Sequence, residues 1–161
     1  MHSKVRVKIC GITNIVDMDA TIRYGTHYVG FMFFEKSPRF TNLNLAKKLS
    51  LHAGNKIKKV AVTVNLDNQT LDEIVKKVPL DFIQLHGKES PERVLEIKKR
   101  YKLPVIKAIG ISKKADLELI SQFNDVADQL LIDAKSPSSS ILPGGNGLNF
   151  DWKLLKDFIF Q

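Results

Sequence analysis

The sequence contains little cysteine, few aromatic residues and no long apolar run. Cys10 is the only cysteine among 161 residues, which excludes an internal disulfide framework and predicts a reducing, cytoplasmic compartment. No apolar stretch has the length of a membrane span, and the N-terminus lacks the apolar core of a signal peptide. We therefore expect no membrane association.

Acidic residues are also few compared with basic ones, and the formal net charge is +8. The basic residues cluster in short groups such as Lys98-Lys99-Arg100, at positions where helices would face solvent. Aromatic residues do not alternate with these groups, as they do in proteins that bind single-stranded nucleic acid. The charge thus predicts a solvated lysine-rich surface and no nucleic-acid partner, and it favours an anionic small-molecule substrate.

Short β-branched runs alternate with longer segments of helical periodicity. In those segments apolar residues recur every three or four positions, as in Ile15, Met18 and Ile22. Six βα units of about 25 residues each predict an α/β fold with a parallel sheet, whose last helix runs from about 150 to 158. The predicted strands are 5–9, 27–33, 58–64, 81–85, 105–109 and 129–132.

Helix-boundary signals agree with this pattern. Thr70-Leu71-Asp72-Glu73 has the form of a capping box, and Ser90 precedes a proline at the first turn of a helix. Gly25 and Gly54 occur where the first two helices should end.

Reactive side chains lie at or just after the C-terminal ends of the predicted strands, except for Lys107, which lies within the fifth strand. In a parallel sheet these ends lie on one rim, where functional groups gather. The residues concerned are Cys10, Arg39, Gln84, His86, Lys107 and Asp133.

Each of these residues also has a structural interpretation. Cys10 could be a small core residue, and Asp133 could cap a turn. His86 could be half-buried without a ligand, Arg39 could pair with a surface carboxylate, and Gly144-Gly145-Asn146-Gly147 could be a flexible turn. Together, however, a thiol, a carboxylate and an arginine suit proton transfer on an anionic substrate, and no metal or nucleotide motif competes. The residues alone predict a cofactor-free isomerase or lyase.

Five motifs, in order, cover the chain from residue 4 to about 153. They are Val7-Lys8-Ile9-Cys10-Gly11-Ile12-Thr13, Gly30-Phe31-Met32-Phe33 with Ser37-Pro38-Arg39, Gln84-Leu85-His86-Gly87-Lys88-Glu89, Leu131-Ile132-Asp133, and Gly144-Gly145-Asn146-Gly147 leading into Phe150-Asp151-Trp152. In these motifs the sequence resembles the phosphoribosylanthranilate isomerase family of tryptophan biosynthesis.

The resemblance implies a TIM (βα)₈-barrel fold and a cofactor-free Amadori rearrangement. The reaction converts N-(5-phosphoribosyl)anthranilate into 1-(2-carboxyphenylamino)-1-deoxyribulose 5-phosphate. By the same resemblance Asp133 is the general acid, and Cys10 is the general base, for which it requires a lowered pKa. The residues implied in substrate binding are Arg39 at the anthranilate carboxylate, Gln84 and His86 on the rim, and Gly144, Gly145 and Gly147 at the phosphate.

The chain holds only about six βα units, whereas a complete barrel of eight such units takes roughly 200 residues. We therefore expect residues 1–161 to form a single partial-barrel domain of a truncated enzyme, as a monomer or homodimer. Two alternatives stay open: an inactive partial barrel that only binds a ligand or partner, and another barrel enzyme acting on a phosphorylated sugar.

Overall fold

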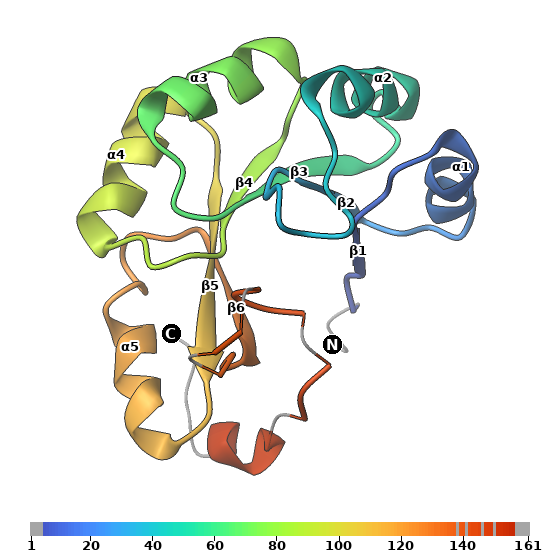
Figure 1. Cartoon of the computed structure of the whole chain (residues 1–161). Helices are drawn as coiled ribbons and strands as arrows, with labels where there is room; N and C mark the ends of the chain where they lie inside the picture. The colour runs from blue at the N-terminus through green and yellow to red at the C-terminus, as the bar shows by residue number, and fades with distance from the viewer. Residues whose placement is uncertain (1–4, 138, 141, 146, 150, 157–161) are drawn as a thin grey trace. The chain divides into compact units, whose positions relative to one another are not determined.

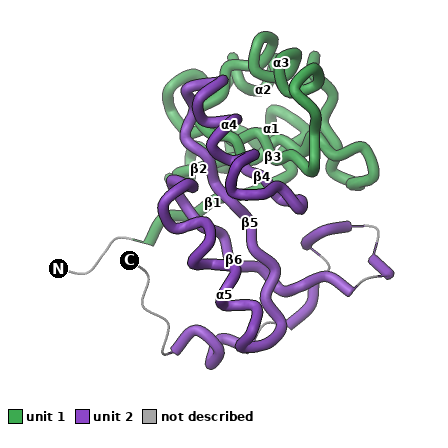
Figure 2. The backbone as a smooth tube through the Cα atoms, turned by 90° about the vertical axis from the view of Figure 1, so that its left-hand side faces the viewer, with its two compact units in different colours: residues 1–83 green, residues 84–161 purple. Residues whose placement is uncertain are grey.

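The computed structural model describes residues 5–137, 139–140, 142–145, 147–149 and 151–156. The chain divides into two compact units, Met1–Ile83 and Gln84–Gln161 (Figure 2). Strands and helices alternate along the chain, and the strands join one sheet in chain order, β1 to β6. β4 (Phe82–Leu85) begins in the first unit and ends in the second. Among the described residues, no helix is long and apolar enough to cross a membrane.

The first unit consists of three βα repeats. Its elements are β1 (Lys8–Cys10), α1 (Ile15–Arg23), β2 (Tyr28–Met32), α2 (Leu43–Ala53), β3 (Lys58–Thr63) and α3 (Asn68–Lys77), as Figure 1 shows. β1, β2 and β3 pair in parallel, so that Cys10 lies opposite Gly30. Apolar side chains of the strands and helices, including Phe31, Met18 and Leu49, are fully buried and form the core.

The second unit carries the last repeats. Its elements are α4 (Pro91–Tyr101), β5 (Val105–Ile111), the 3₁₀ turn η1 (Lys114–Leu117), the short helix α5 (Glu118–Ser121), β6 (Gln129–Ala134) and the 3₁₀ turn η2 (Trp152–Leu155). β5 and β6 pair in parallel from Ile106 to Ile111, and this pairing places Asp133 opposite Gly110.

All six predicted strands are present; the ends of β2, β3 and β4 differ from the predicted ones by one residue, and those of β1, β5 and β6 by more. β1 begins at Lys8 instead of residue 5, because Val5 and Val7 are exposed and only the residues from Lys8 onward pair with β2. β5 and β6 each continue two residues beyond their predicted ends, because their pairing persists through Gly110 to Ile111 and Ala134.

The prediction of a capping box at Thr70 is wrong. α3 begins earlier, because the Asp67 side chain caps it by accepting a hydrogen bond from the Thr70 amide at 2.8 Å. The cap at Ser90 is confirmed, and so is the end of α2 at Gly54, whose φ of 55° suits glycine. In place of the last predicted helix, the described residues form only η2; residues 150, 157 and 158 lie outside the described part.

Candidate active site

The predicted site residues fall into two groups, one in each unit. In the first unit, Cys10 ends β1 and Arg39 lies in the loop after β2. Arg39 Nη1 donates a hydrogen bond to the Cys10 carbonyl oxygen at 3.0 Å. The arginine therefore binds the backbone of the residue that carries the thiol, while its side chain stays exposed to solvent.

Two glycines make room for this arrangement. A Cβ atom at Gly30 would lie 2.7 Å from Cys10 Sγ, so the thiol occupies the space that a side chain on β2 would fill. A Cβ atom at Gly11 would lie 2.5 Å from Arg39 Cδ, and Gly11 also has a φ of 86°. Larger residues at either position would displace the thiol or the arginine.

The thiol of Cys10 is held mainly in its protonated form. Burial raises its pKa, while the positive charges of Lys8 and Arg39 lower it to a smaller extent. Burial also lowers the pKa of Lys8. The pKa of the thiol therefore lies above its ordinary value, whereas the general base was expected to have a lowered one.

In the second unit, a chain of polar contacts joins Gln84, His86 and Asp133. Gln84 Nε2 lies 2.9 Å from His86 Nδ1, and His86 Nε2 lies 3.3 Å from Asp133 Oδ2. Because the amide nitrogen of Gln84 can only donate, Nδ1 accepts its hydrogen bond and the ring proton is on Nε2. His86 therefore donates to the Asp133 carboxylate.

The glycine loop lies against this contact. A Cβ atom at Gly144 would collide with both His86 Nε2 and Asp133 Oδ2, so only glycine fits there. The pKa of Asp133 is lowered by the hydrogen bond from His86 above all, and further by the amides of Ala134 and Gly145, while burial opposes the shift. Gly147, by contrast, is exposed, and no atom of the described residues lies within 4 Å of the position where its Cβ would be.

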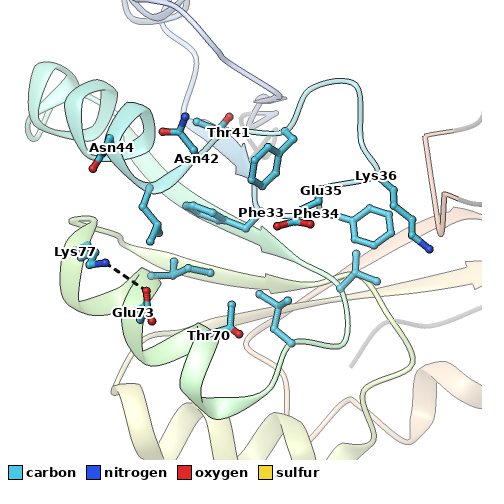
Figure 3. A pocket seen from close by; sticks show the side chains of 15 residues that line it. Phe33, Phe34, Glu35, Lys36, Thr41, Asn42, Asn44, Thr70, Glu73 and Lys77 are labelled. Atoms are coloured by element: carbon cyan, nitrogen blue, oxygen red, sulfur yellow. Dashed lines mark hydrogen bonds and ion pairs between the residues drawn. The ribbon is translucent and has the colours of Figure 1, made fainter.

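Cavities are present in each unit. One of about 360 Å³ is lined by Asp133 together with Ile132, Leu148 and Trp152 among others. A larger one, of about 700 Å³, lies in the first unit between the loop after β2 and α3 (Figure 3). Phe33 and the Lys77–Glu73 ion pair line this larger cavity, but none of the predicted site residues does.

Sequence reasoning did not assign roles to four residues near these groups. Gly11 and Gly30 were parts of motifs, but only the structure shows which side chains they accommodate. Lys107 was noted as a strand residue, and its partner Glu89 was not singled out; in the structure they form a buried ion pair at 3.0 Å. The sequence signal for this ion pair was a lysine within a buried strand that has no further charged residue. In the part of the chain that is described, no three His, Cys, Asp or Glu side chains gather as a metal site.

Comparison with known proteins shows which family the chain matches. Residues 7–161 match the family described as N-(5'-phosphoribosyl)anthranilate (PRA) isomerase. The chain belongs to this isomerase family. The N-(5'-phosphoribosyl)anthranilate isomerase of Cereibacter sphaeroides is 53% identical over 151 residues, which are 94% of this chain and 71% of that protein.

Solved structures of this isomerase family have the same fold. The crystal structure of phosphoribosyl anthranilate isomerase from Thermotoga maritima gives a TM-score of 0.83 at 36% identity, covering 94% of this chain and 70% of that one. A crystal structure of a phosphoribosyl anthranilate isomerase in complex with reduced 1-(o-carboxyphenylamino)-1-deoxyribulose 5-phosphate gives a TM-score of 0.80 at 32% identity, covering 95% of this chain and 69% of that one. The chain thus has the fold of the TIM-barrel family, with six strands in its described part.

Proposed function

We propose that the protein catalyses the Amadori rearrangement of N-(5-phosphoribosyl)anthranilate to 1-(2-carboxyphenylamino)-1-deoxyribulose 5-phosphate in tryptophan biosynthesis. The observation that carries the proposal is the family match over residues 7–161. Two further facts support it: the related isomerase binds a reduced form of this product, and the chain has a thiol and a carboxylate at the C-terminal ends of strands.

In the proposed mechanism Asp133 acts first, as the general acid. It gives its proton to the furanose ring oxygen, the bond from that oxygen to C1′ breaks, and the nitrogen lone pair forms a C1′=N iminium ion. The Cys10 thiolate then removes the proton from C2′, and the electron pair of that C–H bond forms an enolamine. The enolamine takes up a proton at C1′ and loses one from its hydroxyl group, which gives the ketone product without a cofactor.

The remaining site residues bind the substrate in this proposal. The exposed guanidinium of Arg39 suits the anthranilate carboxylate, since an arginine fork pairs well with a planar anion. Gln84 and His86 line the site beside Asp133. The backbone amides of the loop with Gly144, Gly145 and Gly147 suit the phosphate, because consecutive amides in a turn form an anion-binding concavity.

This mechanism requires Asp133 protonated and Cys10 ionised at the same time. In the ligand-free protein the pKa of Asp133 is lowered and that of Cys10 is raised. When the two groups together carry one proton, that proton therefore resides mainly on Cys10. The productive state, with the proton on Asp133, is the minor one. Catalysis then proceeds through a small fraction of the enzyme, and the pH dependence of the rate records both shifts.

The decisive experiment measures consumption of fluorescent phosphoribosylanthranilate by the purified chain and by Cys10→Ala and Asp133→Ala. Each substitution should lower kcat/KM by about 10²–10⁴-fold, the usual contribution of a general acid or base. Asp128→Asn is the matched control, because Asp128 precedes β6 and bonds to the Val105 amide and Lys98; its activity should stay near that of the unmodified chain.

Other results would favour the alternatives. A folded chain that binds the substrate but does not convert it would indicate a binding domain. Turnover of a different phosphorylated sugar, with none of phosphoribosylanthranilate, would indicate another barrel enzyme. Wild-type rates in both Cys10→Ala and Asp133→Ala would refute the acid–base roles.

We further propose that the two units together form one partial-barrel domain, which acts in the cytoplasm as a monomer or homodimer. A reducing compartment suits a base that is a free thiol, since oxidation would remove it. Sedimentation of the active chain distinguishes the two oligomeric states.

A further inference from the structure

Lys107 and Glu89 form a buried ion pair that the proposed mechanism does not use. Both side chains are almost inaccessible, with 4% of each exposed. Lys107 Nζ lies 3.0 Å from Glu89 Oε2, 2.8 Å from the Gly87 carbonyl oxygen and 3.3 Å from the Leu85 carbonyl oxygen. An ammonium group has three donors, so these three acceptors use all of them.

The pair holds the backbone on both sides of His86. On one side, Lys107 binds the Leu85 carbonyl, which belongs to the peptide group before His86. On the other side, Glu89 accepts from the Gly87 amide at 2.9 Å, and this amide belongs to the peptide group after His86. The orientation of both peptide groups, and with it the direction in which the imidazole leaves the chain, is therefore fixed by one ion pair.

The imidazole itself contacts the proposed acid. Gln84 donates to Nδ1, and Nε2 lies 3.3 Å from Asp133 Oδ2. We infer that Lys107 and Glu89 are positioning residues, which hold His86 where its Nε2–H donates to Asp133. This inference rests on the proposed function for its catalytic consequence, although the geometry is independent of it.

Lysine is suited to this position by shape as well as charge. Its ammonium group is compact and can address acceptors in three directions, whereas a guanidinium group is planar and larger. Lys107 is buried, and its Nζ also lies 5.6 Å from the centroid of the Phe123 ring. Methionine would keep the length of the side chain but would donate no hydrogen bond.

The test uses the full chain with Lys107→Met, Glu89→Gln and the double variant. A single substitution leaves one buried charge unpaired and can impair folding, whereas the double variant leaves none. Lys59→Met is the matched control: Lys59 is also buried in a strand, and its Nζ also binds a carbonyl oxygen, of Gly54, and a carboxylate, of Asp81, but it lies at the start of β3.

Two readouts are needed, and one of them does not depend on activity. The imidazole ¹⁵N shifts of His86, assigned with His86→Asn, should show a single tautomer with the proton on Nε2 in the unmodified chain. In the folded double variant they should move toward the average of two exchanging tautomers, and kcat should fall about 10- to 100-fold, because the Asp133 carboxyl group loses the donor that orients it. Lys59→Met should alter neither the shifts nor kcat.

The inference is overturned if the folded double variant keeps the wild-type His86 shifts and kcat. A loss of thermal stability without a change in the His86 shifts would also overturn it, because it would show that the pair is only structural. If the unmodified chain has no isomerase activity, the proposed function fails, but the ¹⁵N shifts still decide whether the pair positions His86.

Discussion

Space for the Cys10 thiol is provided by Gly30, its partner in register on β2. A Cβ atom at Gly30 would lie 2.7 Å from Cys10 Sγ and 3.1 Å from Val62 Cγ2. Gly30→Ala should therefore displace the thiol, cost about 1–3 kcal/mol of stability through overpacking and lower kcat/KM. Urea denaturation and steady-state kinetics measure the two effects.

The background of Cys10→Ala serves as the control for this prediction. Without the sulfur atom, the closest contact of the new methyl group disappears, and the contacts with Val62 Cγ2 at 3.1 Å and with the Cβ atom of residue 10 at 3.2 Å remain. The stability cost of Gly30→Ala should then be clearly smaller than in the unmodified chain. Equal costs in both backgrounds would show that the thiol does not fill this space.

The opposite pKa shifts of Asp133 and Cys10 predict an unusually wide pH optimum. The acidic limb of kcat/KM should lie below the ordinary pKa of an aspartate, because His86 lowers the pKa of Asp133. The alkaline limb should lie above the ordinary pKa of a thiol, because burial raises the pKa of Cys10. Since kcat/KM reports the free enzyme, its profile measures these two groups directly.

A substitution assigns the acidic limb of that profile. His86→Asn removes the ring that lowers the pKa of Asp133 most, so this limb should move to higher pH, while the alkaline limb stays in place. If both limbs of the kcat/KM profile lay between the ordinary pKa values of an aspartate and a thiol, the predicted protonation states would be contradicted.

At the scale of elements, the start of α3 is set by Asp67 and not by Thr70. Asp67 accepts from the Thr70 amide at 2.8 Å. Asp67→Ala should therefore cost about 1 kcal/mol, the usual value of a lost N-cap, whereas Thr70→Ala should cost distinctly less. Urea denaturation of both variants measures these losses of stability. A larger loss for Thr70→Ala than for Asp67→Ala would show that Thr70 is the cap, as the sequence predicted.

The order and type of the elements could be predicted because their signals are local. Six β-branched runs, the Ser90-Pro91 start and the glycine after α2 are each read within a few residues, and the structure contains them all. Their ends depend on partners that are distant in sequence. β1 shortens because Val5 and Val7 remain exposed, and β5 lengthens because β6 continues to pair with it.

The candidate site was predictable to a similar extent. Reactive residues at strand ends could be located from the pattern, and the motifs identified the family. The contacts that determine their behaviour could not be read, because they join residues far apart in the chain. The contact of His86 with Asp133 and the bonds of Lys107 to the loop after β4 both need the fold to be known.

For the whole molecule, the division into two units separates the reactive groups along the chain. Cys10 and Arg39 belong to the first unit, and Gln84, His86 and Asp133 belong to the second. Each unit also contains a buried lysine with a carboxylate partner, Lys59 with Asp81 and Lys107 with Glu89.

Acid should destabilise each unit through an aspartate with a lowered pKa. In the first unit burial opposes the shift, but hydrogen bonds from Lys59 and Lys58 keep the pKa of Asp81 low. In the second unit Lys135, followed by Ser112 and Lys113, lowers the pKa of Asp116. A carboxyl group with a lower pKa in the folded state stabilises it above the unfolded value, and this contribution disappears as the pH falls through the folded value.

The free energy of unfolding should therefore be constant near neutral pH and should fall below about pH 4. Asp116→Asn should lower stability at pH 7 by about 1–3 kcal/mol, as for a buried charged acceptor, and Asp81→Asn should lower it by less, because solvent screens the partly exposed Asp81; both should flatten the acid-induced decrease. Far-UV circular dichroism follows the whole chain, while the only tryptophan, Trp152, reports on the second unit. If Asp81→Asn shifts the dichroism transition and leaves the fluorescence transition in place, the units unfold separately; coincident shifts of both signals in both variants show one cooperative domain.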